Sequence, residues 1–265
     1  LLPVSNQYNG VVRNLELRHT GPSGKVVNFA DGEFHQLLGS TIYVGDVSST
    51  DVSVYFRSSS TIIADNTFKG NRPAFAIHSD RTSGLVNINS VIRDNYFGGV
   101  GKAILAKTSD GSARQEGLLI DSNTFVCTGQ KQIEVHEHLD IRIVNNMLDQ
   151  GDQHCIWLTP TAQGIDGRLI ADNYISTAAN TTGGVGVEVD PAAAGNVGRL
   201  RVKGNYFAFS GYGLAVGATV ASLTVIGNDF GTCSQLALGI NQAKNVTVVA
   251  NQFGNLGGNN FLFAD

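Results

Sequence analysis

A six-residue phrase recurs eight times between residues 63 and 253, and every copy carries Asn at its fourth position. Each copy begins with Ile or Val and ends with Phe, Leu or Ile, as in the first, IADNTF. The repeated residues are Asn66, Asn95, Asn123, Asn146, Asn173, Asn205, Asn228 and Asn251. Successive Asn residues lie 23 to 32 positions apart, which suits one coil of three short strands plus loops. Leucine-rich repeats are shorter and propeller blades need about 40–45 residues, so the period favours a parallel β-helix.

Apolar and polar residues alternate before each Asn, as at Leu200 and Val202, which predicts a strand with one buried face. The Asn then falls at a bend, where its tolerance of left-handed backbone geometry is useful. Stacked from coil to coil, the amides are expected to form a hydrogen-bonded ladder. The sequence thus predicts an all-β fold, a right-handed single-stranded parallel β-helix of about ten coils. We expect it to form one domain over residues 1–265.

A second short strand follows each Asn, as in IEVHE (133–137) and CIWLT (155–159). Strict alternation turns Ile133, Val135, Ile156 and Leu158 inward and leaves two outward columns on the same sheet. The first predicted column holds Ala76, Leu105, Glu134, Trp157, Glu188, Ala215 and Ala237. The second predicted column holds His78, Lys107, His136, Thr159, Asp190, Gly217 and Gly239.

Charge and hydropathy narrow the possible partners. The formal net charge is −4 and no basic cluster exceeds two residues, which argues against nucleic acid as a partner. No run of about eighteen apolar residues and no charged-then-apolar leader occurs, so neither membrane insertion nor a signal peptide is predicted. Cys127, Cys155 and Cys233 are widely spaced and are expected to be buried thiols. Because the chain begins at Leu1 and stops within a coil, we expect it to be part of a longer chain.

The repeated Asn phrase, over residues 60–265, resembles the pectin-lyase-like right-handed β-helix superfamily. Within that superfamily it resembles the bacteriophage tailspikes, which bind and cut bacterial surface polysaccharides. The resemblance implies a groove on the sheet that holds IEVHE, CIWLT and VEVD (187–190). It also implies a capsular or lipopolysaccharide glycan as partner, a homotrimer of parallel rods, and a place in the virion tail. Lyases, hydrolases, epimerases and adhesins share this coil, so the resemblance leaves the chemistry open.

Three acidic residues of the outward face are candidate catalytic groups, namely Glu134, Glu188 and Asp190. The backbones of Glu134 and Glu188, two coils apart, are expected about 9–10 Å from each other, and those of Glu188 and Asp190 about 6.5–7 Å. Inverting glycosidases hold their carboxyl pair about 6.5–9.5 Å apart, and retaining enzymes about 5–5.5 Å. The spacing therefore favours an inverting endo-glycosidase, a polysaccharide depolymerase. A like-charged neighbour and an adjacent indole would raise the pKa of the carboxyl that acts as acid.

Four further residues are candidate substrate contacts. Trp157, the only tryptophan, is predicted to face outward beside the carboxylates, where an indole can stack on a sugar ring. His136, Lys107 and His78 are expected to contact the glycan from the same face.

Two alternatives stay open. One is a non-catalytic receptor-binding or adhesive rod that uses the same face. The other is a polysaccharide lyase in which Lys107 or His136 acts as base. His136 and His138 with Glu134 and Glu137 lack the zincin spacing, so no metal and no other cofactor is expected.

Overall fold

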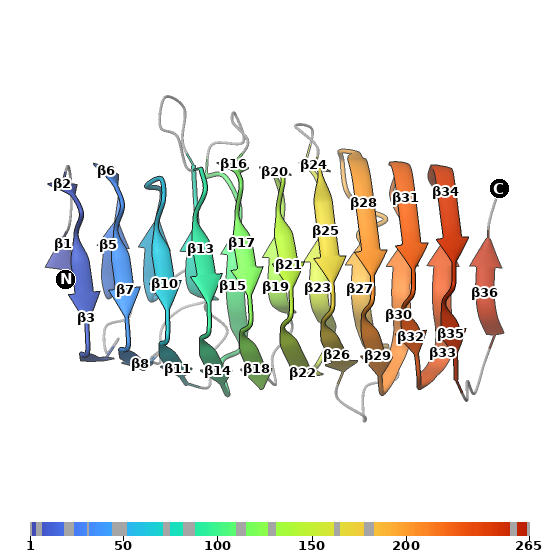
Figure 1. Ribbon diagram of the computed structural model, residues 1–265, viewed down its shortest axis with the longest axis horizontal. Coiled ribbons are helices and arrows are strands. Elements are labelled where there is room, and N and C mark those ends of the chain that lie inside the picture. Colours follow the sequence, from blue (N-terminus) through green and yellow to red (C-terminus); the bar gives the residue numbers. More distant parts are fainter. Residues whose placement is uncertain are drawn as a thin grey trace.

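The computed structural model is a right-handed parallel β-helix whose strands stack along one long axis from the N-terminal to the C-terminal end (Figure 1). All regular elements among the described residues are β-strands. The structure describes residues 2–3, 7–18, 24–30, 32–43, 52–70, 75–81, 88–109, 115–126, 131–161, 165–177, 183–254 and 259–263.

Three long parallel sheets, here named A, C and D, run along the rod, with a two-stranded sheet B beside them. The eleven strands of sheet A are β1 (Leu2–Pro3), β5 (Val27–Phe29), β9 (Val54–Phe56), β12 (Phe75–Ser79), β15 (Lys102–Ala106), β19 (Lys131–Val135), β23 (His154–Leu158), β27 (Val185–Val189), β30 (Ser210–Val216), β33 (Cys233–Ile240) and β36 (Asn259–Phe263). Sheet B pairs β2 (Gln7–Tyr8) with β6 (Gly32–Glu33).

Sheets C and D contain the strands on either side of the repeated Asn. Sheet C holds β3 (Val11–Arg13), β7 (Gln36–Leu38), β10 (Ile62–Ala64), β13 (Val91–Arg93), β16 (Gln115–Glu116), β17 (Leu119–Asp121), β20 (His138–Leu139), β21 (Arg142–Val144), β24 (Ile165–Asp166), β25 (Arg168–Ala171), β28 (Val197–Lys203), β31 (Val220–Ile226) and β34 (Ala243–Val249). Sheet D holds β4 (Glu16–Arg18), β8 (Thr41–Tyr43), β11 (Thr67–Lys69), β14 (Tyr96–Gly98), β18 (Thr124–Val126), β22 (Met147–Gly151), β26 (Tyr174–Thr177), β29 (Tyr206–Ala208), β32 (Asp229–Phe230) and β35 (Gln252–Phe253).

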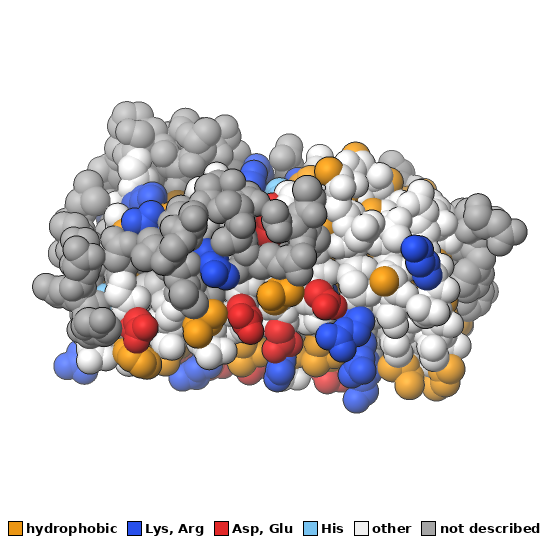
Figure 2. Space-filling model, turned by 90° about the horizontal axis from the view of Figure 1, so that it is seen from above, with side chains coloured by type: hydrophobic (Ala, Val, Ile, Leu, Met, Phe, Trp, Pro, Cys, Tyr) orange, Lys and Arg blue, Asp and Glu red, His pale blue; other side chains and the backbone are white. Residues whose placement is uncertain are grey.

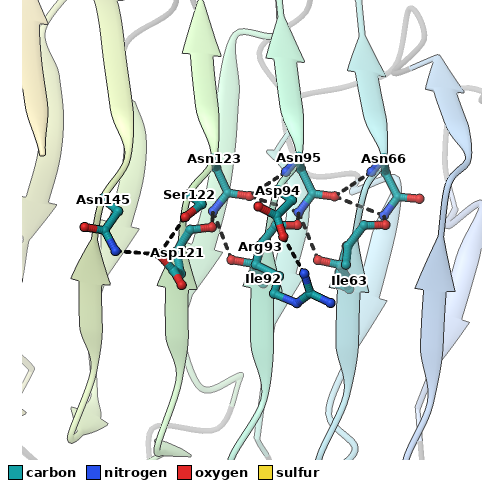
Figure 3. Close-up of polar contacts among 11 residues, drawn as sticks. Ile63, Asn66, Ile92, Arg93, Asp94, Asn95, Asp121, Ser122, Asn123 and Asn145 are labelled. Atoms are coloured by element: carbon teal, nitrogen blue, oxygen red, sulfur yellow. Dashed lines mark hydrogen bonds and ion pairs between the residues drawn. The ribbon is translucent and has the colours of Figure 1, made fainter.

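The predicted Asn ladder is confirmed. Figure 3 shows the side chains of Asn66, Asn95 and Asn123 in a row, one per coil. The Nδ2 group of Asn66 donates to Oδ1 of Asn95 at 3.0 Å, and Asn95 donates to Asn123 at 3.0 Å. The same bond repeats through every copy to the Asn228–Asn251 pair at 2.9 Å. Nδ2 of Asn95 also donates to the Ile63 carbonyl at 2.9 Å, so the ladder joins neighbouring coils.

The bend itself differs from the prediction in one respect. The left-handed residue is the one immediately before the Asn, as at Asp94 with φ 55° and Asp172 with φ 55°. Gly204 and Gly227 occupy the same position in later coils, where a left-handed conformation costs glycine nothing. The Asn is therefore free to point its amide inward, while its predecessor turns the chain.

Two features extend or vary the repeat. Eight turns carry the repeated Asn, slightly fewer than the ten or so coils predicted, and the first rungs of sheets C and D form without it. In the rung before Asn66, Ser40 takes the place of Asn, and its backbone N–H donates to Oδ1 of Asn66 at 2.9 Å. A small hydroxyl residue can thus end the ladder.

Apolar side chains stack coil on coil inside the rod. The rings of Phe68, Phe97 and Phe125 are parallel, with centroids 4.8 and 4.7 Å apart. All three rings are fully buried, and complete burial of such a side chain stabilises the fold by about 1.5–3 kcal/mol. Cys155 and Cys233 are buried, as predicted, whereas Cys127 lies outside the described residues. No helix in the described parts of the chain is long and apolar enough to cross a membrane.

Candidate functional site

The register of sheet A aligns five residues of the first outward column as predicted. Leu105 pairs with Glu134, Glu134 with Trp157, Trp157 with Glu188, and Glu188 with Ala215. The inward partners are also as predicted, since the side chains of Ile133, Val135, Ile156, Leu158, Val187 and Val189 are all fully buried. Glu134, Trp157 and Glu188 therefore follow one another on three successive coils.

The two ends of the predicted columns are wrong. His78, not Ala76, pairs with Leu105, so His78 belongs to the Glu134 column rather than to the Lys107 column. At the other end Gly239, not Ala237, pairs with Ala215. Ala76 and Ala237 are fully buried. The pairing of β30 with β33 shifts register by one residue between residues 210 and 212, which accounts for one of the two residues of the C-terminal error.

Strict alternation also fails within central strands of sheet A, such as β15, β19 and β23. Gln132 and Ile133 are both fully buried, as are Cys155 and Ile156 in the next coil. Because two consecutive side chains point inward, the side chain two positions before the inward Ile points outward instead of inward. A third outward column results, in which Lys102, Lys131, His154, Val185 and Tyr212 pair in succession. Lys131 and His154 therefore lie beside the predicted carboxylates, whereas strict alternation from Ile133 and Ile156 would turn both inward.

Glu134 is held between two cationic or hydrogen-bonding groups. Its Oε1 lies 2.6 Å from Nε2 of His136, and its Oε2 lies 3.4 Å from Nζ of Lys131. The carboxylate side chain is only 11% exposed. Burial alone raises the pKa of Glu134, but the His136 hydrogen bond and the Lys131 charge oppose it and bring the pKa below its ordinary value. Glu134 is thus ionised at neutral pH.

Trp157 carries a cation on one face of its ring. Nζ of Lys131 lies 2.8 Å from the ring centroid, and the imidazole of His154 stacks near the indole with centroids 5.7 Å apart. The indole is half-buried. Burial lowers the pKa of Lys131, against the opposing attraction of Glu134. The cation–π contact helps to hold the ammonium group between the indole and the carboxylate.

Glu188 completes the row of contacts. Its Oε2 lies 2.8 Å from Nδ1 of His154, a close approach that lacks the alignment of a hydrogen bond. Both side chains are 18% exposed. Contacts thus run without a break from Glu134 through Lys131, Trp157 and His154 to Glu188. We call these five residues, together with His136, the sheet A site.

The other predicted site residues lie around this cluster. Asp190 follows the Glu188 strand, and its Oδ1 accepts a hydrogen bond from the Ala192 N–H at 2.8 Å, which shapes the turn. Its charge reaches the Lys131 ammonium, whose pKa it raises. Lys107 is exposed, and its carbonyl oxygen lies 3.0 Å from Nε2 of His78.

His78 is separated from the sheet A site by one coil. Leu105 stands between His78 and Glu134 in their column. Burial lowers the pKa of His78, and its ring packs edge-on against Tyr55 with centroids 5.4 Å apart. The Tyr55 hydroxyl in turn hydrogen-bonds to the buried Asp80 at 2.5 Å. His78 thus belongs to a second polar cluster nearer the N-terminal end.

The described residues contain no group of three or more His, Cys, Asp or Glu side chains placed to hold a metal ion. Two members of the predicted His and Glu run are buried in structural roles. An Oε atom of Glu137 accepts from the Thr108 hydroxyl at 3.0 Å, and Nδ1 of His138 contacts the Leu139 carbonyl at 2.9 Å. Glu137 and His138 are therefore separated from Glu134 and His136, which belong to the sheet A site.

Neither a family model nor a curated protein matches the chain. Solved structures with the same fold include a surface adhesin of Streptococcus pneumoniae, 16% identical with a TM-score of 0.60, over 98% of this chain and 83% of the adhesin. A mannuronic-acid-specific polysaccharide family 6 lyase from human gut microbiota is 14% identical with a TM-score of 0.59, over 91% of this chain and 67% of the lyase.

The tailspike protein of E. coli bacteriophage HK620, solved with a pentasaccharide, is 12% identical with a TM-score of 0.59. The match covers 93% of this chain, which spans 60% of the tailspike's length. These likenesses establish the fold: the chain has the β-helix architecture that tailspikes and polysaccharide lyases share.

Proposed function

We propose that this protein binds a bacterial surface polysaccharide along sheet A and cleaves it by hydrolysis at the sheet A site. One observation carries the proposal, the unbroken row of contacts from Glu134 through Lys131, Trp157 and His154 to Glu188. It combines a flat ring, which suits the apolar face of a sugar, with carboxylates on the coils before and after it.

The two carboxylates have different roles in this mechanism. Glu134, with its lowered pKa, is the general base that removes a proton from the attacking water. Glu188 is the acid that gives its proton to the oxygen of the leaving sugar, and Asp190 lies beside it as the alternative donor. Glu134 and Glu188 are two strands apart, so their backbones are about 9–10 Å from each other, which leaves room for water between the carboxyl groups. The expected outcome is inversion at the anomeric carbon.

The setting of the protein is part of the same proposal. The solved structures with this fold include a tailspike bound to a pentasaccharide, a polysaccharide lyase and a surface adhesin, and these likenesses support a glycan or surface role. We propose that this chain acts outside the cell as part of a phage tailspike, assembled as a homotrimer. Light scattering that gives a monomer mass near 28 kDa at high concentration would contradict the trimer.

A polysaccharide lyase is the second candidate, and a specific observation favours it. Burial lowers the pKa of Lys131, and its ammonium lies 3.4 Å from Glu134. A lysine with a lowered pKa can remove the proton beside a uronic acid carboxyl, which begins β-elimination. Hydrolysis adds water across the broken bond, whereas elimination leaves an unsaturated sugar that absorbs ultraviolet light.

The test is incubation of the protein with a panel of capsular and O-antigen polysaccharides, followed by product sizing and ultraviolet absorbance. Hydrolysis predicts shorter saturated products, with cleavage lost in Glu188→Gln while binding persists. Unsaturated products would establish the lyase instead. Binding without any cleavage by the wild type would establish an adhesive rod, and neither binding nor cleavage would contradict the glycan role.

A further inference from the structure

A second charged groove lies on sheet C, away from the sheet A site. It follows the bend between the short strands β20 and β24 and the strands β21, β25 and β28. The residues that line its main hollow of about 260 Å³ are Asp140, Arg142, Gly167, Arg168, Leu169, Arg199 and Arg201. In Figure 2, basic and acidic side chains gather along one long edge of the rod.

The backbone explains why the surface is hollow here. Asp140 and Gly167 are both in the left-handed region, with φ 48° and 70°, so the chain turns sharply at the same place in successive coils. An adjoining hollow of about 250 Å³ shares Asp140 and Arg142 and continues past Gly117 to earlier coils. Because the same bend recurs in successive coils, the groove runs along the long axis of the rod. An extended polymer could lie along it.

The floor of the groove alternates apolar and cationic side chains. In register along sheet C lie Val91, Leu119, Arg142, Leu169 and Arg201, one residue per coil. Arg142 and Arg201 are therefore two strands apart, about 9–10 Å between backbones. Within the described part of the chain, the exposed Arg201 guanidinium has no hydrogen bond or ion pair, so its donors are available.

The charge of the groove is positive. Its four arginines outnumber the two nearby acids, of which Asp140 contacts Arg142 at 3.4 Å and Asp166 contacts Arg199 at 3.3 Å. Both ion pairs are exposed, and such pairs are weak enough for an anionic ligand to displace. Arg168 adds a charge that cannot move away, because its side chain is buried and donates to the His138 carbonyl at 2.6 Å.

We infer that this groove is a second glycan subsite, and that it takes an acidic saccharide whose anionic groups bind Arg142 and Arg201. Planar guanidinium groups suit carboxylate or sulfate ester oxygens, and Leu119 and Leu169 suit the C–H faces of the sugar rings between them. A single-stranded nucleic acid fits less well, because the lining residues include no aromatic ring to stack on bases. The choice of a glycan rests on the proposed function, whereas the anion site rests on the arginines alone.

The test measures binding of three oligomers of equal length to the full chain by calorimetry. These are oligogalacturonate, a sulfated oligosaccharide and neutral dextran, with a single-stranded oligonucleotide of matched charge as a fourth probe. We expect at least one acidic saccharide to bind, dextran to bind more weakly, and the acidic binding to weaken as salt rises. Arg201→Ala should weaken it by about tenfold, because a charge-assisted hydrogen bond is lost from an exposed side chain that leaves the fold intact.

Two control variants separate this inference from the proposed function. Lys244→Ala removes an equal charge from an exposed position of β34 on the same sheet and should leave the affinity unchanged. Trp157→Ala alters the sheet A site, so binding of the acidic saccharide at the sheet C groove should persist in this variant. Adding Arg201→Ala to it should then weaken that remaining binding. If neither acidic saccharide binds, if Lys244→Ala weakens binding as much as Arg201→Ala, or if the oligonucleotide binds as tightly, the inference is overturned.

Discussion

The ammonium group of Lys131 lies 2.8 Å from the centre of the Trp157 ring, on the strand one coil before it. The same ammonium lies 3.4 Å from the Glu134 carboxylate, so one cation joins the stacking surface to the base of the sheet A site. A sugar that stacks on Trp157 must use the other face of the indole or displace Lys131. Displacement of Lys131 would bring the sugar toward Glu134, the partner of that ammonium group.

Trp157→Ala should weaken binding of the oligosaccharide product by about tenfold or less. The reason is that sugar stacking on an indole contributes on the order of 0.5–1.5 kcal/mol beyond area burial. Isothermal titration calorimetry measures the change, with Tyr206→Ala as the matched control, because Tyr206 is an exposed aromatic residue on sheet D. Equal losses in the two variants, or a much lower melting temperature with intact binding in Trp157→Ala, would remove the indole from the binding surface.

His136→Leu should move the acid limb of the kcat/KM profile to higher pH. In the wild type the His136 hydrogen bond helps to hold the pKa of Glu134 below its ordinary value, against burial. Without that bond, burial raises the pKa, so the base becomes protonated at a higher pH and activity fails earlier on acidification. The charge-removing variant Lys244→Gln, far along the rod, should keep the wild-type profile. An unmoved acid limb in His136→Leu would show that Glu134 is not the base.

Replacing Asn146 or Asn173 by Ala should each cost about 1–3 kcal/mol in the free energy of unfolding, since buried backbone groups lose their amide partner. Asn146, for example, donates to the Ile120 carbonyl at 3.0 Å and accepts from Asn123. Asn245→Ala is the control, because Asn245 is exposed and outside the ladder. Urea unfolding measures all three variants. Ladder variants as stable as Asn245→Ala would contradict a structural role for the amides.

Acid should destabilise the fold through His138. Burial, followed by the charge of Arg168, lowers the pKa of His138 to about 3, from 6.5 when unfolded. The unfolded chain therefore gains a proton below pH 6.5 that the folded chain refuses until about pH 3, so stability is lost as pH falls through this window. Between pH 7 and 5 the loss should be about 2 kcal/mol.

The His138→Gln variant isolates that contribution. Between pH 7 and pH 5 the free energy of unfolding should fall in both proteins. The fall should be about 2 kcal/mol smaller in His138→Gln than in the wild type. Urea unfolding at pH 7 and pH 5 gives the comparison, and the remaining histidines titrate equally in both proteins. Identical pH dependence in the two proteins would mean that His138 is protonated in the folded state.

The sequence was sufficient to predict the ladder and the central column because each repeats without a break. An Asn in every coil fixes the spacing of the coils, and the residues that follow it align Glu134, Trp157 and Glu188. The distance from the Asn to this column is 11 residues at Glu134 and Trp157 but 15 at Glu188, so the inward Ile, Val and Leu pattern aligned the central strands. That pattern misplaced His78 and Ala237 near the ends. A short phrase contains no signal for a register shift between two strands that are far apart in sequence.

Lys131 and His154 were missed for a different reason. The side-chain pattern of a regular strand reverses at every residue, but Gln132 and Ile133 both point inward. This irregularity recurs in neighbouring coils, where small or polar residues such as Ala103 and Cys155 precede the inward Ile. That recurrence was a usable signal, whereas the contacts of Lys131 with Trp157 and Glu134 depend on side-chain conformations that no spacing predicts.

A crystal structure of Glu134→Gln with an oligosaccharide of the cleaved polysaccharide would show directly whether the sugar lies along the sheet A site. The substitution keeps the shape of the side chain and removes the base, so an intact oligosaccharide should remain bound. We expect sugar density along sheet A, with one ring stacked on Trp157 and a glycosidic oxygen within hydrogen-bond distance of Glu188. A bound oligosaccharide that contacts neither Trp157 nor Glu188, in a crystal where sheet A is open to solvent, would contradict this expectation.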